Sequence, residues 1–459
     1  MGLSASIYKD LEKIVQKKHV TAKKEELLCH SYDATGQSFL PDAVIFPETE
    51  DQVARILKLA SKRKFYIIPR GSGSGMTGGS VPVNGGVVLV TSRLNKIIEI
   101  DEENFIARVE PGVIVSDIHR KVEARGLFYP PDPASSSVCT IGGNVGECAG
   151  GPRAVKYGVT RDYILGLRAV LPSGEIIKTG VSTAKGVAGY DLTRLIVGSE
   201  GTLALVTEIT LKLLPKPAAV KTLAIFFDEM GKAAQTISNV MKLAIIPRCV
   251  EYLDEASINL VRGVLSIDLP KSVKALIILE LDGDAHQVEK ESEQIKNFCY
   301  GAGAIEVLVA ADQKEALKLW EARKSLSPIL YKIAPNKINE DIVVPISKIP
   351  MMVEITREIQ KSSGLTVVSF GHAGDGNIHC NIMYDKNDED QTKRAEKAVD
   401  DLFKATLELG GTITGEHGVG ITKMKYLSME IGSHELEIMR RIKKVFDPEN
   451  ILNPGKIFS

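Results

Sequence analysis

The stretch Pro69-Arg70-Gly71-Ser72-Gly73-Ser74-Gly75-Met76-Thr77-Gly78-Gly79 decides the fold class of this chain. Three of its glycines have the spacing of the dinucleotide-binding fingerprint, which requires a helix directly after it. Pro82 and the run Asn84-Gly85-Gly86 follow instead, and they exclude a helix there. The Rossmann interpretation is therefore rejected. The composition suits a nest of backbone N–H groups and hydroxyls around phosphate oxygens, with a plain glycine-rich turn as the alternative.

The residues before this loop predict a β-strand, an α-helix and a second strand. The strands are expected at 42–46 and 65–68, and Thr49 with Gln52 forms a capping box that opens the helix between them. The apolar face of the helix consists of Val53, Ile56, Leu57 and Ala60. A βαβ unit with parallel strands is expected.

Two further glycine-rich runs follow the first one. One extends from Pro130-Pro131-Asp132-Pro133 through 140–151, and the other covers 189–203. Between them, 163–171 and 175–179 predict a hairpin around Pro172-Ser173-Gly174. Backbone this bare of side chains packs closely against something large and flat. Three such loops among short strands predict one extended ligand that is contacted repeatedly.

A second decisive stretch is Ser369-Phe370-Gly371-His372-Ala373-Gly374-Asp375-Gly376-Asn377-Ile378-His379-Cys380-Asn381. Its middle, Gly374-Asp375-Gly376, predicts a tight turn between two strands. Residues seven apart in one strand face opposite ways, but a hairpin lets His372 and His379 converge.

The cluster Gly415-Glu416-His417-Gly418 completes a set of metal ligands. Two imidazoles and the Glu416 carboxylate are a three-ligand set that leaves a coordination position open, as catalytic metal sites do. His417 then remains as a base. The alternative is that these are ordinary turn histidines. Three of the chain's eight histidines lie in the two clusters, which favours the metal site.

The composition narrows the classes of function. A chain of 459 residues predicts two or three domains, and 44% hydrophobic and 25% charged residues are typical of a globular protein. The net charge of −1 gives no support for nucleic acid or an anionic membrane as partner. Six cysteines without a Cys-x-x-Cys pair argue against an iron–sulfur cluster and against a disulfide framework. Without an apolar run of membrane-spanning length, a cytoplasmic location is expected, or a peripheral one at the inner membrane face.

After Pro215-Lys216-Pro217 the pattern alternates between strands and helices. Strands are expected at 221–227, 248–253, 274–281 and 305–309, with helices at 230–243, 255–264 and 285–300. This order predicts a ferredoxin-like α+β arrangement. Further helices are expected at 312–324, 346–361, 389–409 and 435–446. The expected domains are 1–217, 218–410 and a C-terminal segment, 411–459.

Together these motifs resemble a known family. The three glycine-rich runs resemble the vanillyl-alcohol-oxidase-type FAD-binding domain. The two histidine clusters and the closing Ile451-Leu452-Asn453-Pro454-Gly455-Lys456 resemble the branch of glycolate oxidase catalytic subunits, D-lactate dehydrogenases and D-2-hydroxyglutarate dehydrogenases. The resemblance covers nearly the whole chain. It implies an α+β fold with a two-part FAD-binding domain, a ferredoxin-like cap domain and a tail that packs back on the FAD domain.

The resemblance also implies a flavin site. No histidine lies in the first two glycine-rich runs and Cys148 is the nearest thiol, so non-covalent FAD is expected. The implied cofactor-binding residues are Pro69, Arg70, Gly71, Ser72, Gly73, Ser74, Gly75, Thr77, Gly78, Pro131, Asp132, Ser135, Thr140, Gly142, Gly143, Asn144, Gly146, Ala149, Gly150, Glu200, Gly201, Val206 and Asn453. Arg70 to Thr77 would hold the pyrophosphate.

A substrate site follows from the same resemblance. Arg323 would clamp a substrate carboxylate, because a planar guanidinium matches that group. Ser327, Lys337 and Asn381 would contact the substrate as well. The spacing between Lys337 and Pro345 departs from the 2-hydroxyglutarate enzymes, which favours D-lactate or glycolate over a dicarboxylate.

The expected activity is oxidation of a D-2-hydroxy acid to a 2-oxo acid with hydride transfer to FAD. A divalent metal, namely zinc, manganese or iron, would be held by His372, His379 and Glu416. His417 would act as the base. Arg323 and Asn381 would be the other catalytic residues. Electrons would pass to an iron–sulfur subunit, an electron-transfer flavoprotein or a quinone, and a homodimer is compatible with the sequence. The alternatives are D-2-hydroxyglutarate dehydrogenase and a catalytically silent FAD-binding subunit; an ether-lipid synthase type fits poorly.

Overall fold

The structure, a computed structural model, describes residues 3–263 and 270–458. It divides into two compact units. The first contains Met1–Gly150, Val159–Lys216 and Glu416–Ser459, and the second contains Gly151–Gly158 and Pro217–Gly415. In the described ranges, no helix has both the length and the apolarity needed to cross a membrane.

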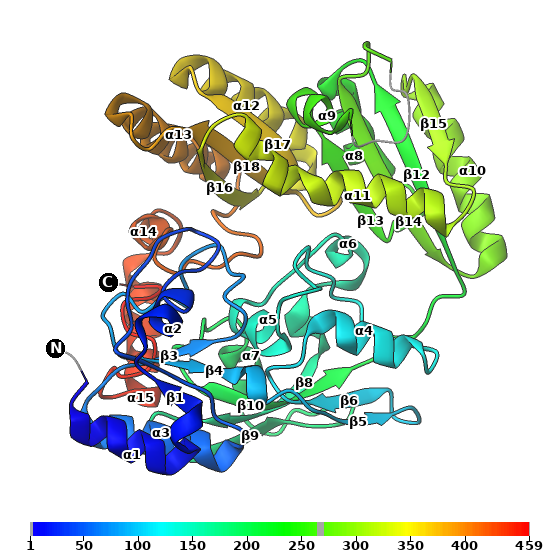
Figure 1. The fold of residues 1–459 in the computed structure, drawn as a ribbon. Helices are drawn as coiled ribbons and strands as arrows, with labels where there is room; N and C mark the ends of the chain where they lie inside the picture. The colour runs from blue at the N-terminus through cyan, green and yellow to red at the C-terminus, as the bar shows by residue number, and fades with distance from the viewer. Residues whose placement is uncertain (1–2, 264–269, 459) are drawn as a thin grey trace. The chain divides into compact units, whose positions relative to one another are not determined.

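The first unit is built on two sheets and a short strand pair (Figure 1). The four-stranded sheet has the order β1 (Val20–Thr21), β2 (Ala43–Ile45), β4 (Val87–Val90), β3 (Ile67–Arg70). The five-stranded sheet has the order β5 (Ile97–Asp101), β6 (Ile106–Val109), β10 (Leu205–Lys212), β8 (Ile164–Val170), β9 (Ile176–Gly180). β11 (Leu214–Pro215) pairs with β7 (Leu127–Phe128). The helices are α1 (Ala5–Val15), α2 (Lys24–Cys29), α3 (Glu50–Arg63), α4 (Val115–Glu123), α5 (Ile141–Glu147), α7 (Leu192–Ile196), α14 (Leu427–Glu430) and α15 (Ser433–Phe446).

Helix α3 begins at the predicted cap. The Gln52 N–H donates to Thr49 Oγ1 at 3.3 Å, and Gln52 Oε1 accepts from the Glu48 N–H at 2.7 Å. The four predicted apolar residues of α3 are fully buried, in the core that lies under the four-stranded sheet. β2 and β3 both run parallel to β4, which lies between them, so the expected parallel unit forms with an inserted strand. No helix follows the first glycine-rich loop up to β4, as its sequence predicts.

The second glycine-rich run differs from the expected loop, because its middle forms helix α5. Thr140 caps the helix by accepting a hydrogen bond from the Gly143 N–H at 3.3 Å. Gly142 lies so close to Pro111 that a Cβ there would be 2.6 Å from the Pro111 Cβ. The glycines of this run therefore serve close packing of a helix as well as the formation of a loop.

The second unit is a seven-stranded antiparallel sheet covered by helices (Figure 1). The strand order is β15 (Glu306–Val309), β12 (Ala219–Phe227), β14 (Ala275–Gly283), β13 (Cys249–Leu253), β17 (Thr366–His372), β18 (Asn377–Tyr384), β16 (Asn336–Val343). The helices are α6 (Ala154–Tyr157), α8 (Met230–Val240), α9 (Glu255–Val261), α10 (Ala285–Gly301), α11 (Gln313–Ile329), α12 (Ile349–Ser363) and α13 (Glu389–Glu408). The predicted ferredoxin-like order is found in β12, α8, β13, β14, α10 and β15. The helix expected after β13 forms as α9. Val264, the last residue expected in that helix, lies outside the described residues.

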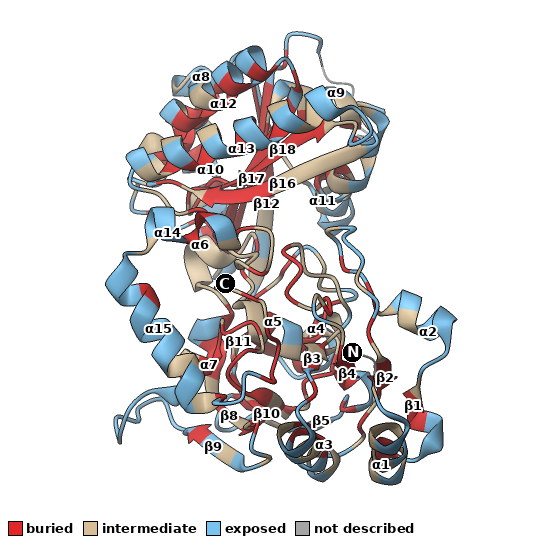
Figure 2. Cartoon of the chain, turned by 90° about the vertical axis from the view of Figure 1, so that its left-hand side faces the viewer, coloured by how far each residue is buried: buried red, intermediate tan, exposed pale blue. Residues whose placement is uncertain are grey.

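The predicted hairpin forms and extends this sheet. β17 pairs with β18, and Phe370 is the cross-strand partner of His379. β17 also pairs with β13, and β18 pairs with β16. Strand β16 was not predicted, because its sequence Asn336–Val343 alternates poorly and carries five polar or charged residues in its first six positions. The hairpin is thus an interior part of the sheet, and its strands are buried (Figure 2).

The two faces of the sheet carry different residues. α9 and α11 pack on one face, where Leu253, Phe370 and Met383 belong to one apolar core. Because side chains alternate along a strand, Glu251, His372 and His379 lie on this same face. α12 packs on α8 and α13, which together with α10 form the other helical layer. Figure 2 shows these helices with exposed outer sides over buried strands.

We expect Gly376→Ala to destabilise the protein more than Gly410→Ala. Both glycines have positive φ, 87° and 79°, at which an alanine costs about 1–2 kcal/mol. A Cβ at Gly376 would also lie 2.0 Å from the Val344 carbonyl oxygen, whereas a Cβ at Gly410 meets no atom within 4 Å. Urea unfolding of both variants measures the difference. Equal losses would show that the hairpin turn tolerates a side chain.

Candidate functional site

A cavity of about 260 Å³ lies in the first unit, among the three glycine-rich runs. The predicted cofactor residues that line it are Pro69, Arg70, Gly71, Ser72, Gly73, Ser74, Gly75, Ser135, Thr140, Gly142, Gly143, Asn144, Gly146, Ala149, Glu200, Gly201 and Val206. Glu147 and Ser199, which lie in the second and third glycine-rich runs, line it too. Glu416 and His417 also line it, although the sequence assigned them to the metal and to the base. The predicted residues outside its lining are Thr77, Gly78, Pro131, Asp132, Gly150 and Asn453.

Three glycines leave open space at this cavity. A Cβ at Gly75 would meet its nearest described neighbour at 3.9 Å, and a Cβ at Gly146 at 4.0 Å. At Gly143 the nearest atom would be the hydroxyl of its own helix cap, at 3.4 Å. Packing within the chain therefore does not require glycine at these positions, and a side chain would project into space that a ligand can use. This bare surface fits a large, flat cofactor.

Arg70, the first residue of the stretch expected to hold the pyrophosphate, has a guanidinium that bonds to the chain itself. Its Nη2 donates to the Tyr32 carbonyl at 2.7 Å, and its Nη1 lies 3.4 Å from Ser80 Oγ. A Cβ at Gly73 would lie 2.0 Å from Nη2, so the guanidinium supports the loop from beneath. Burial lowers the pKa of Arg70. Its hydrogen bonds commit the guanidinium to the chain itself.

Two predicted cofactor residues outside the lining connect the loop with the C-terminal segment. Thr77 Oγ1 donates to the His417 carbonyl at 3.1 Å. Asn453 Nδ2 donates to the Gly79 carbonyl at 2.9 Å and to the Glu200 carbonyl at 2.7 Å. Both residues stabilise the cavity wall instead of forming its surface.

Glu200 anchors the backbone that follows His417. Its two carboxylate oxygens accept from the Val419 N–H at 2.8 Å and the Gly420 N–H at 2.7 Å. Burial raises the pKa of Glu200 above its ordinary value, although these two hydrogen bonds and the nearby Lys456 and Lys423 lower it. The carboxylate therefore fixes the segment that carries the predicted base.

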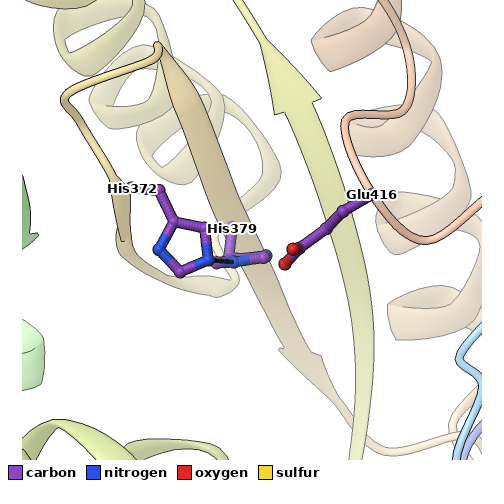
Figure 3. A group of neighbouring side chains, drawn as sticks. All are labelled: His372, His379 and Glu416. Carbon is purple, nitrogen blue, oxygen red and sulfur yellow. Dashed lines mark hydrogen bonds between the residues drawn. The ribbon is translucent and has the colours of Figure 1, made fainter. Parts of the chain in front are cut away.

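The two histidines of the hairpin converge as predicted. The Nε2 atoms of His372 and His379 lie 3.4 Å apart, and both residues are buried. Gly415, the last residue of the second unit, is fixed to strand β16 because its N–H lies 2.8 Å from the Asp341 carbonyl oxygen and 2.9 Å from Asp341 Oδ2. Glu416 is the next residue, and one ligand atom from each of His372, His379 and Glu416 lies within 4.8 Å of the others. Figure 3 shows the three side chains pointing toward one another.

Sequence analysis missed a fourth member of this cluster, Glu251. One of its oxygens contacts His372 Nδ1, and the other accepts from Arg323 Nε at 2.7 Å. Burial raises the pKa of Glu251, but His372 and Arg323 lower it by more, so that its pKa lies below the ordinary value. The available signal was a lone acid within the apolar strand β13.

The structure also brings together the predicted substrate residues of α11 and β16. The Arg323 guanidinium lies 4.6 Å from the centre of the Phe370 ring, and its hydrogen bond to Glu251 uses Nε alone. Lys337 Nζ donates to Ser327 Oγ at 2.7 Å. Burial lowers the pKa of Lys337.

Asn381 does not fit the predicted contact with substrate. It is fully buried, and its Nδ2 donates to the Val368 carbonyl at 3.2 Å. Its Oδ1 accepts from Asn339 Nδ2 at 2.7 Å. These bonds place Asn381 within the sheet as a support for the neighbouring His379.

Comparison with known proteins identifies the family. Residues 216–457 match the family model "FAD linked oxidases, C-terminal domain", and residues 41–180 match "FAD binding domain". The chain belongs to the FAD-linked oxidases. The predicted family and its FAD cofactor are thereby confirmed.

Relatives of this FAD-linked oxidase agree along nearly the whole chain. It is 47% identical to "Glycolate oxidase subunit GlcD" of Bacillus subtilis over 94% of this chain and 92% of that one. It is 36% identical to "D-lactate dehydrogenase" of Anaerostipes hadrus over 91% and 89%. A crystal structure of p-cresol methylhydroxylase has the same fold, with a TM-score of 0.82 at 18% identity over 99% of this chain and 98% of the other. The predicted fold class is confirmed.

We expect Gly146→Leu to weaken FAD binding by the FAD-linked oxidase at least about tenfold, because the new side chain occupies cavity space. Titration of apoprotein with FAD, followed by flavin fluorescence, measures the affinity. Gly231→Leu is the control, since a Cβ there meets no described atom within 4 Å and Gly231 does not line the cavity. Unchanged affinity in Gly146→Leu would exclude this wall as the flavin site.

Proposed function

We propose that this FAD-linked oxidase oxidises a D-2-hydroxy acid to the 2-oxo acid, with D-lactate or glycolate as the favoured substrate. The observation that carries the proposal is the group His372, His379 and Glu416, whose ligand atoms lie within 4.8 Å of one another. The printed activities of the relatives, glycolate oxidase and D-lactate dehydrogenase, support the substrate class.

The ligand group suits a divalent metal, namely zinc, manganese or iron. Imidazole and carboxylate are ligands that all three accept, and three protein ligands leave a position for substrate. Glu251 contacts His372 Nδ1, which leaves Nε2 for coordination. When bound, the metal would lower the pKa of a coordinated substrate hydroxyl.

The remaining roles fall to His417 and Arg323. His417 takes the hydroxyl proton as the general base. Arg323 binds the substrate carboxylate through its Nη groups while Glu251 holds its Nε. FAD, when bound, would supply the acceptor for a hydride from the substrate carbon. The protein supplies orientation and charge for that transfer.

A second candidate substrate is D-2-hydroxyglutarate. The observation that favours it is the half-buried Lys337 beside Ser327, a cation that could receive a second carboxylate. A monocarboxylate leaves Lys337 with its present hydroxyl partner. The two candidates therefore differ in whether Lys337 contributes to substrate affinity.

Reduced FAD must be reoxidised by a partner. The word "subunit" in the name of the glycolate oxidase relative supports an assembly, and an iron–sulfur subunit, an electron-transfer flavoprotein or a quinone would accept the electrons. Non-covalent binding of the flavin is supported by the state of the two nearby thiols. Cys139 lines the cavity and Cys148 does not, and burial raises the pKa of both, which makes them poor nucleophiles. A silent FAD-binding subunit is disfavoured by the intact ligand group.

We expect His417→Ala to lower the rate of flavin reduction by about 10²–10⁴-fold, the usual contribution of a general base, while FAD affinity changes little. Anaerobic stopped-flow mixing with D-lactate measures the reduction rate, and flavin fluorescence measures the affinity. His434→Ala, on α15, is the matched control. If His417→Ala reduces its flavin as fast as the parent protein, His417 is not the base.

Removal of divalent metal should abolish flavin bleaching by the substrate. D-lactate, glycolate, D-2-hydroxyglutarate and L-lactate are added separately and anaerobically, with and without chelator treatment and metal readdition. Bleaching by one D-acid or by glycolate, lost on chelation and restored by metal, is expected. Bleaching that survives complete metal removal would contradict the metal role, and no bleaching by any acid would favour the silent subunit.

A further inference from the structure

Glu251 contacts both the proposed metal ligand His372 and the proposed substrate clamp Arg323. We propose that Glu251 is a positioning residue that uses one oxygen to set the metal-binding form of His372 and the other to aim Arg323 at the substrate carboxylate. Metal affinity and substrate affinity then depend on the same carboxylate. This inference rests on the proposed function.

The backbone holds Glu251 directly opposite His372. The two residues are cross-strand partners in the pairing of β13 with β17. Glu251 is fully buried, and all five residues of β13 are buried. A buried carboxylate is costly unless its oxygens are paired, and both oxygens of Glu251 have partners. Its position is thus fixed by the sheet and by both contacts.

The contact with His372 selects one tautomer. A carboxylate only accepts, so Nδ1 carries the proton and Nε2 keeps its lone pair. That Nε2 is the atom 3.4 Å from His379 Nε2, where a shared metal would be bound. A carboxylate behind a metal-binding imidazole raises the basicity of the imidazole and fixes its ring, and its loss usually costs 10–100-fold in metal affinity.

The contact with Arg323 orients the substrate clamp. Glu251 accepts from Nε at 2.7 Å, and the guanidinium lies over the ring of Phe370, which is two residues before His372. One edge of the guanidinium is therefore occupied, and the Nη groups remain for a planar, bidentate contact with a carboxylate. A rotated guanidinium would lose that geometry.

A glutamine cannot replace this acid at both contacts. Its amide has one acceptor and one donor group, whereas His372 Nδ1–H and Arg323 Nε–H both donate. If the oxygen faces His372, the amide N–H₂ opposes Arg323. If the oxygen faces Arg323, the amide donates to Nδ1 and moves the proton of His372 to Nε2, which removes the metal-binding lone pair. Either orientation damages one of the two functions.

The matched control is Glu280 on the adjacent strand β14. It is also buried and also accepts two side-chain donors, Thr222 Oγ1 at 2.8 Å and Trp320 Nε1 at 2.6 Å. Trp320 lies on α11 three residues before Arg323, so Glu280→Gln disturbs the same helix without contact with His372 or Arg323 among the described side chains. It controls for the loss of a buried charge.

The experiment measures metal affinity and steady-state kinetics on the FAD-loaded enzyme. Zinc or manganese affinity is measured by competition with a chromophoric chelator, which needs no turnover. In Glu251→Gln we expect a loss of metal affinity of at least about tenfold. With metal at saturation, KM for the acid should stay about tenfold above that of the parent, because Arg323 remains misaligned. Glu280→Gln should stay within about twofold of the parent in both quantities.

Four outcomes are decisive. Unchanged metal affinity in a folded Glu251→Gln overturns the proposal while the proposed function stands. Recovery of the parental KM at saturating metal overturns the coupling to Arg323. If the parent binds neither zinc nor manganese, this inference and the metal role fall together, whereas flavin reduction still tests the oxidase activity. If Glu251→Gln does not fold, Glu251→Asp decides, since its shorter acid reaches one partner at most and should show at least one of the two losses.

Discussion

The antiparallel pairing of β13, β17, β18 and β16 is the constraint on which the site depends. It places Glu251 opposite His372, and it places Asp341 opposite His379. Asp341 in turn fixes Gly415, the residue before Glu416. A slip of one residue would turn every one of these side chains to the other face of the sheet. The backbone hydrogen bonds of the sheet interior therefore set the positions of residues from four parts of the sequence: Glu251, Asp341, the histidine hairpin and the segment at Gly415.

The cost of this arrangement is the burial of charge. An isolated carboxylate in an apolar sheet is unstable, and an ion pair offsets the cost only with good geometry and further hydrogen bonds. Glu251 meets both conditions, because each oxygen has its own donor. The same face carries the apolar core that packs under α9 and α11. The polar cluster thus occupies one end of a face whose other residues supply the stabilisation by burial.

Sequence motifs predict the structural features that a few neighbouring residues determine. The Thr49 cap, the turn at Gly376 and the prolines and glycines after the first glycine-rich loop each act through a few neighbouring residues. The missed features depend on distant partners. β16 is stable because β18 pairs with it along its whole length, despite a polar sequence. The role of Glu251 can be recognised only from its contacts with His372 and Arg323, which lie 121 and 72 positions away in the sequence.

The difference between local signals and distant partners also applies to the residues of the site. A hairpin brings its two strands side by side, so the turn at Gly374-Asp375-Gly376 allowed the convergence of the two histidines to be predicted. A resemblance transfers residue identity but not the partners of a side chain, and for Arg70 and Asn381 only the structure shows those partners. Arg70 meets the Tyr32 carbonyl, and Asn381 meets Asn339. These polar groups form hydrogen bonds within the chain, whereas Arg323 uses only its Nε to bond to Glu251. Side chains that retain donors after the fold is satisfied are those that can act on a substrate, and Arg323 on α11 meets that condition.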